Sequence, residues 1–213
     1  MEYENKELCS KCGGRCCKKG GCDYYVSDFK SIDKNTILKV LETGNVSIVS
    51  AFKYEILTNG KKVVVPILYL RARNEGKKVI DLFSMKKRCS MLTSTGCSYN
   101  LEQRPGGGVN LIPNEKGCKP LNNPLDELKK WYPYQNLLAK IVKRYTGKTV
   151  DMVLKSDIEE VFYEVLSENF DGVDKLEIAD ILECLPDLVE CYPEEYIKAK
   201  NRKNNEIKLV RNK

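Results

Sequence analysis

The chain has 213 residues, a formal net charge of +6, ten cysteines and no histidine. Without histidine it has no Ser-His or Cys-His nucleophile pair, no imidazole metal ligand and no histidine general base. Its length is enough to bury a core without cross-links, so clustered cysteines in a reducing compartment favour metal binding or redox chemistry over structural disulfides.

The N-terminal residues Met1–Glu7 contain no apolar segment of the kind found in a signal peptide. The longest apolar runs, such as Val63–Leu70, are too short to span a membrane. We therefore expect a cytoplasmic protein with no membrane partner.

The densest group of cysteines lies in residues 1–27. Its sequence is Cys9-Ser-Lys-Cys-Gly-Gly-Arg-Cys-Cys17, followed by Cys22. Two cysteines separated by two residues, such as Cys9 and Cys12, present both sulfurs to one ion from a tight turn. We expect irregular loop structure here, held by a metal, with the neighbouring glycines giving the backbone freedom.

A short helix is predicted over residues 28–43, ended by Gly44, with Asn35-Thr36 capping its second part. Strands are predicted over residues 46–57 and 62–73. Asn59-Gly60 between them is typical of a type I′ hairpin turn, and Pro66 indicates an edge or a bulge.

Two further short strands are predicted over residues 77–83 and 85–92. The expected fold class is α+β, with a small, mostly antiparallel sheet of three or four strands beside a thiolate metal cluster, plus a C-terminal helical bundle. The domain boundary is predicted after residue 123, with a cysteine-cluster metal-binding domain over 1–123 and a helical region packed on it over 124–213.

Residues 93–123 are expected to be a long loop that lacks regular structure, pinned by Cys97 and Cys118. Within it, Arg104-Pro-Gly-Gly-Gly108 has two interpretations. Its exposed amides cradle an anion, or it is a glycine-rich turn beside a metal, which we favour.

The remainder is predicted to be helical, with each expected end marked by a proline, a glycine or a capping residue. One helix covers 125–145 after Pro124, and another starts at 149 and restarts at the capping-box spacing of Ser156 and Glu159. A third covers 175–189 and breaks near Pro186, and a last one covers 193–203 before a frayed tail. Cys184 and Cys191 are interpreted as small apolar core residues.

The candidate metal ligands are eight cysteines from the N-terminal and central groups: Cys9, Cys12, Cys16, Cys17, Cys22, Cys89, Cys97 and Cys118. Sites built from thiolates alone favour zinc, cuprous copper or iron–sulfur clusters. One zinc ion takes four ligands, so eight cysteines suffice for two zinc sites or for one 4Fe-4S cluster with spare thiols.

The central cysteines form a second block of Cys89-Ser-Met-Leu, then Gly96-Cys97-Ser-Tyr99, then Arg104-Pro105. With the N-terminal CxxCxxxCC block, this resembles the YkgJ-type cysteine-cluster family, a zinc- or iron-chelating CxxCxxCC domain, over about residues 9–120. The gap before Cys16 is one residue longer here. The family often has a cysteine and an arginine shortly after Arg-Pro, where this chain has glycines; Cys118 is the candidate replacement ligand.

The same blocks are similar to the cysteine-rich part of flagellin lysine methylases, which are thought to carry an iron–sulfur cluster. This resemblance implies iron–sulfur rather than zinc. Three functions are carried forward: a metal-binding protein, an enzyme that modifies a protein or peptide by methyl transfer or redox chemistry, and a zinc-stabilised interaction module.

The excess of Lys and Arg lies in residues 1–123, which is the one feature that suggests nucleic acid. The favoured explanation is that these cations offset several thiolates, so we do not favour nucleic acid as a partner. A protein or peptide is the remaining candidate partner.

Overall fold

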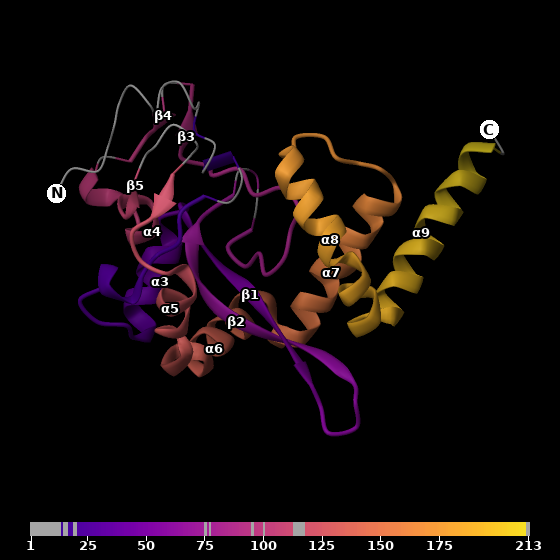
Figure 1. The fold of residues 1–213 in the computed structure, drawn as a ribbon, viewed down its shortest axis with the longest axis horizontal. Coiled ribbons are helices and arrows are strands. Elements are labelled where there is room, and N and C mark those ends of the chain that lie inside the picture. Colours follow the sequence, from indigo (N-terminus) through magenta and orange to yellow (C-terminus); the bar gives the residue numbers. More distant parts are fainter. Residues whose placement is uncertain are drawn as a thin grey trace.

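The computed structural model describes residues 14, 17–18, 21–74, 76, 78–94, 96–99, 101–112 and 118–211. Over these residues the protein has an α+β fold, made of small antiparallel two-stranded sheets and a set of C-terminal helices (Figure 1). A long hairpin runs through the middle of the molecule, with helices on either side of it (Figure 1). No helix of the described residues is long and apolar enough to cross a membrane.

The hairpin consists of β1 (Val46–Ile56) and β2 (Lys62–Ala72), paired from Val46 with Ala72 to Ile56 with Lys62. Its turn is closed by the Gly60 amide, which donates to the Leu57 carbonyl at 2.8 Å. Gly60 has a φ of 78°, but Asn59 is not in the positive-φ region. A type I′ turn needs positive φ at both central residues, so the predicted turn type is wrong, although the predicted hairpin is confirmed.

β2 carries Pro66 opposite Phe52 in a sheet of two strands, which confirms the expected edge. At Leu68 the outer edge of β2 is satisfied by a side chain rather than by a third strand. The Leu68 amide donates to Gln135 Oε1, and Gln135 Nε2 donates to the Leu68 carbonyl, both at 2.8 Å.

The predicted sheet of three or four strands is wrong for the described residues. The segment expected as a strand over 77–83 forms no strand in its described residues; it meets β1 at an isolated parallel bridge between Ile48 and Ile80. Backbone hydrogen bonds accompany this bridge: the Ile48 and Ser50 amides donate to the Val79 and Leu82 carbonyls, and the Asp81 amide donates to the Ile48 carbonyl. The ladder stops there because the amides of Leu82 and Phe83 donate to the Asp157 carboxylate, at 2.9 and 3.3 Å.

The described residues between 92 and 120 include two further small ribbons. β3 (Leu92–Thr93) pairs with β4 (Gly96–Cys97), and β5 (Leu111–Ile112) pairs with β6 (Lys119–Pro120). A 3-10 turn, η2 (Leu101–Gln103), and a short helix, α4 (Gly106–Val109), lie between them. The expected loop therefore has regular structure of its own.

The helix α3 spans Lys34–Glu42 and is shorter than predicted. It begins there because the Asp33 side chain accepts hydrogen bonds from the amides of Asn35 and Thr36. A separate 3-10 turn, η1 (Val26–Asp28), precedes it. Gly44 follows the helix with a φ of 81°, as expected for its stop.

The helix predicted over 125–145 is broken into three pieces. These are α5 (Pro124–Lys129), the 3-10 turn η3 (Tyr132–Tyr134) and α6 (Gln135–Thr146). Pro133 explains the break, since it lacks an amide hydrogen and disfavours helical geometry in the residue before it. Gly147 ends α6 in the left-handed region, as predicted.

Three long helices complete the chain: α7 (Val150–Leu166), α8 (Lys175–Cys191) and α9 (Pro193–Arg211). The predicted restart at Ser156 is wrong, because the Thr149 side chain caps α7 and the helix runs through Ser156. The predicted break at Pro186 is also wrong, since α8 continues past it. α9 extends well beyond the predicted end, into the tail expected to fray.

One large apolar core joins β1, β2, α3 and α6 to the C-terminal helices. Trp131, Leu138, Phe162 and Leu188 are all at most 1% exposed in it. Cys184 and Cys191 are half-buried and pack against this core, in keeping with their interpretation as apolar packing residues. The β1–β2 hairpin thus links the cysteine-bearing segments to the helices.

Candidate metal centre and the adjoining pocket

The segment 21–25 runs beside the C-terminal half of β2. The Tyr24 amide donates to the Leu70 carbonyl, and the Ala72 amide donates to the Cys22 carbonyl, both at 2.9 Å. These bonds place Cys22 next to the end of β2.

Cys17 and Cys89, one from each predicted ligand group, are in direct contact through their backbones. The Cys89 amide donates to the Cys17 carbonyl at 2.7 Å. Both side chains are buried, at 8% and 3% exposure, and they form a small cluster with Ala72. The fold therefore brings one cysteine of the N-terminal group into contact with one of the central group, and the metal centre expected between the groups stays a prediction.

The glycine-rich turn packs directly against the segment 22–28. A Cβ on Gly108 would lie 2.7 Å from Cys22 Sγ, and a Cβ on Gly107 would lie 2.7 Å from the Asp23 carbonyl oxygen. The amides of Gly106 and Gly107 donate to Asp28 Oδ2 and to the Asp23 carbonyl, at 2.8 and 2.9 Å. Because these amides bind the protein itself, the turn packs beside Cys22 instead of presenting them to an anion.

Cys97 lies on the ribbon that follows Cys89. It pairs with Leu92 across β3 and β4, and the neighbouring Ser98 amide donates to the Met91 carbonyl at 2.9 Å. Met91 and Leu92 in turn pack on the cluster of Cys17 and Cys89.

Tyr99 lies within electrostatic range of three of the predicted ligands. Burial raises the pKa of Tyr99, and the negative charge of ionised Cys89, Cys97 and Cys22 raises it further. Its hydroxyl is 3.5 Å from that of Tyr24, whose pKa is raised mainly by burial. Cys22 of the N-terminal group and Cys89 and Cys97 of the central group therefore all act electrostatically on this one tyrosine.

Cys118 directly precedes β6 and is half-buried. Cys9, Cys12 and Cys16 lie outside the described residues. Within the part of the chain that the structure describes, no group of three or more Cys, Asp or Glu side chains is placed to hold a metal ion.

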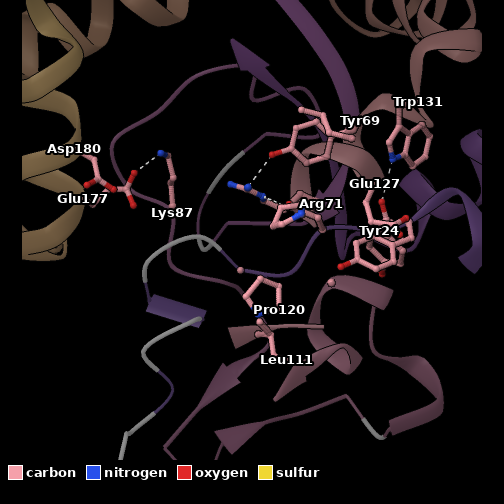
Figure 2. Close-up of a pocket in the computed structure, with 16 residues that line it drawn as sticks. Tyr24, Tyr69, Arg71, Lys87, Leu111, Pro120, Glu127, Trp131, Glu177 and Asp180 are labelled. Atoms are coloured by element: carbon pink, nitrogen blue, oxygen red, sulfur yellow. Dashed lines mark hydrogen bonds and ion pairs between the residues drawn. The ribbon is translucent and has the colours of Figure 1, made fainter. Parts of the chain in front are cut away.

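A pocket of about 400 Å³ opens beside this region. Its walls come from the segment 21–25, β2, Lys87, the turn and ribbon near Gly107 and Pro120, α5 and α8. Figure 2 shows Arg71 and Tyr69 pointing toward one another in its middle, with Lys87 and Glu177 on one side and Trp131 on the other.

Arg71 is held from two directions within the pocket. Its Nε donates to Asp23 Oδ1, and its Nη2 donates to the Tyr69 hydroxyl, both at 2.7 Å. Burial opposes the positive charge, but Tyr69 and Asp23 outweigh this effect and raise the pKa of Arg71. The guanidinium is therefore a fixed cation.

Two sides of the pocket carry carboxylates that are paired with lysines, Glu177 on the side of Lys87 and Glu127 on the side of Trp131 (Figure 2). Glu177, 3% exposed, accepts from Lys87, and Glu127, 6% exposed, accepts from Lys130 at 2.8 Å. These buried acids are compensated, as burial of a charge requires.

A second cavity of about 270 Å³ shares Tyr69, Arg71 and Lys87 with the pocket. The buried polar residues Asn74, Asp81 and Ser84 also line this second cavity. Asn74 Nδ2 donates to Asp81 Oδ2 at 2.9 Å, and Ser84 donates to the same oxygen at 3.3 Å.

Sequence reasoning missed this pocket. One signal was available, because Arg71 directly follows the apolar run Val63–Leu70 within β2. A charged residue at the end of a buried strand needs a partner, and the partner here is Asp23, next to Cys22.

The chain matches no family model, no curated protein and no solved structure. The resemblance to the YkgJ-type cysteine-cluster family therefore rests on the motif residues alone, and membership of that family stays a prediction.

Proposed function

We propose that this chain is a metal-binding protein whose cysteines hold an iron–sulfur cluster that ties its N-terminal segment to its central segment. The observation that supports this most directly is the contact between Cys17 and Cys89. Residues far apart in the sequence meet there through a backbone hydrogen bond, with both side chains buried.

The chemistry of the donors fits such a cluster. The chain has no histidine, so a soft metal is bound here through thiolates. Cys22, Cys89 and Cys97 lie near Tyr99. In this proposal Cys9, Cys12, Cys16 and Cys17 complete the centre from the N-terminal side, and Cys118 is the remaining candidate ligand. An iron–sulfur cluster supplies one-electron redox chemistry when bound.

The test is metal and acid-labile sulfide analysis of protein purified without oxygen, together with its absorption spectrum. Iron, sulfide and a broad band near roughly 400 nm support the cluster. Zinc without colour moves the function to a closed structural site and an interaction module. Protein that holds neither metal contradicts the proposal.

A matched pair of variants separates ligands from packing cysteines. The double variant Cys9→Ser/Cys12→Ser is expected to lose most of the bound metal. The double variant Cys184→Ser/Cys191→Ser, in the helical core, is expected to retain it. Equal metal content in the two variants contradicts this ligand set.

We also propose, as a second function, an enzyme that modifies a protein or peptide by methyl transfer or redox chemistry. The pocket next to Cys22 favours it, since a cleft of this size accommodates a small molecule. Calorimetric binding of S-adenosylmethionine to the purified chain tests the methyl-transfer form, and absence of binding counts against that form.

A further inference from the structure

Three hydrogen-bond donors with unused capacity meet where the two cavities join. Tyr69, Arg71 and Lys87 line both cavities. They come from β2 and from the loop after it, and Figure 2 shows them around the middle of the pocket.

Arg71 uses Nε and Nη2 on Asp23 and Tyr69, and its Nη1 makes no hydrogen bond with any described residue. The Tyr69 hydroxyl accepts from Arg71, which leaves its own proton to donate. Lys87 has three N–H groups, and Glu177 is its hydrogen-bond partner among the described residues.

Tyr69, Arg71 and Lys87 can each donate a further hydrogen bond, and Arg71 and Lys87 carry a positive charge. Hydrogen bonds from charged donors to an anion are stronger than those between neutral groups. A guanidinium that is already held in place loses little further conformational entropy on binding. Among the described residues, four carboxylates line the larger cavity, and all of them are already engaged. Asp23 pairs with Arg71, Glu177 with Lys87 and Glu127 with Lys130, and Asp180 has an interaction of its own. An anionic group at the junction therefore completes the hydrogen bonding.

The larger cavity suits an apolar body attached to that anionic group. Rings and aliphatic side chains contribute to its wall, among them Tyr25, Leu111, Pro120 and Leu128. Planar and aliphatic groups gain most from such surfaces.

We propose that this pocket binds a small organic anion, with a carboxylate or phosphate group at Tyr69, Arg71 and Lys87 and an apolar or aromatic body in the larger cavity. The site contains no proposed metal ligand. It therefore goes beyond the metal-binding function, and loss of the metal and loss of anion binding are separate outcomes.

The test is titration of the full-length protein with phenyl phosphate, benzoate and inorganic phosphate, with benzamide and benzylamine as neutral and cationic controls. Trp131 is the only tryptophan of the chain and lines the pocket, so its fluorescence reports binding, with calorimetry as a second readout. Tighter binding of phenyl phosphate indicates a phosphate ester, and tighter binding of benzoate indicates a carboxylate. Either result supports the site.

The variant Tyr69→Phe keeps the ring and removes one donor, and we expect it to weaken binding roughly tenfold. The double variant Lys87→Met/Glu177→Gln removes a whole ion pair without leaving a buried charge, and we expect a similar loss. Tyr54→Phe, on the neighbouring strand and outside both cavities, is the matched control and should bind like the native chain.

Three results overturn the proposal. One is the absence of binding of both organic anions at millimolar concentration. Another is equal affinity for benzamide or for inorganic phosphate. The third is affinity unchanged by both the Tyr69→Phe and the Lys87→Met/Glu177→Gln variants, with circular dichroism showing that they fold.

Discussion

Asp157 is the residue with the clearest expected effect of pH. Burial, and secondly the charge of Asp81, raise the pKa of Asp157 to about 6, while hydrogen bonds from the amides of Phe83 and Leu82 and the charge of Lys78 oppose this shift. A carboxyl whose pKa is raised in the folded state stabilises folding below its unfolded pKa, near 4, and loses this contribution as the pH rises through 6.

We therefore expect the free energy of unfolding of the native chain to fall by roughly 2 kcal/mol between pH 4 and 7. The variant Asp157→Asn should not show this fall. The amide oxygen of asparagine still accepts from Leu82 and Phe83. Urea unfolding across this pH range measures the effect, with the exposed Asp151→Asn as control. Identical pH profiles for the native chain and Asp157→Asn contradict the assignment.

Gly108 shows how one missing side chain allows the cysteine segment to pack. An added Cβ would meet Cys22 Sγ at 2.7 Å, which requires the turn or the segment to shift. We expect Gly108→Ala to destabilise the protein by about 1–3 kcal/mol and to lower its metal content.

The control for Gly108 is Gly172→Ala, which introduces strain at a φ of 74° in the helical region and meets no atom within 4 Å. It is expected to cost stability without changing the metal content. Unaltered metal in Gly108→Ala, measured with the same assay, would show that the close packing on Cys22 does not matter for the centre.

At the scale of the element, Pro186 lies inside α8 and destabilises the helix locally, while packing on the core keeps the helix continuous. Proline lacks the amide hydrogen that the helix uses and crowds the preceding turn. Pro186→Ala is therefore expected to stabilise the protein by about 1 kcal/mol, measured by urea unfolding. Pro193→Ala is the matched control, because proline at the first position of α9 costs nothing and its replacement should give no stabilisation.

The elements that the sequence predicted well are those with local signals. The apolar runs around Asn59-Gly60 indicated the hairpin, and Gly147 marked the end of α6. The errors came from tertiary contacts, because Asp157 binds the amides of Leu82 and Phe83 and so ends the expected third strand. Pro186 misled for the same reason, since packing of α8 on the core outweighs a local propensity.

At the scale of the whole molecule, the cysteine residues of the candidate centre were predictable because their spacing is a local feature. Their meeting at Cys17 and Cys89 was predicted only in outline. The pocket was not predictable, since its lining comes from segments scattered from Gly21 to Asp180. No local pattern encodes which of these segments the fold brings together.

The last prediction concerns how the metal contributes to folding. If thiolates tie the N-terminal segment to the central one, the free energy of metal binding is part of the free energy that orders these segments. The helices α6, α7 and α9 are held instead by the apolar core around Leu138, Phe162 and Ala199. Removal of the metal should therefore increase hydrogen exchange in residues 1–120 far more than in these helices.

Hydrogen exchange of metal-loaded and metal-free protein measures this difference, and the Cys9→Ser/Cys12→Ser variant should behave like the metal-free form without any chelator. The contact between Cys17 and Cys89 locates the expected effect, because the backbone bond between them joins the two segments most directly. The Cys89 amide, which donates this hydrogen bond, should lose its protection from exchange first. Equal protection of the whole chain in both forms would mean that the core alone holds residues 1–120, and that the metal has no structural role there.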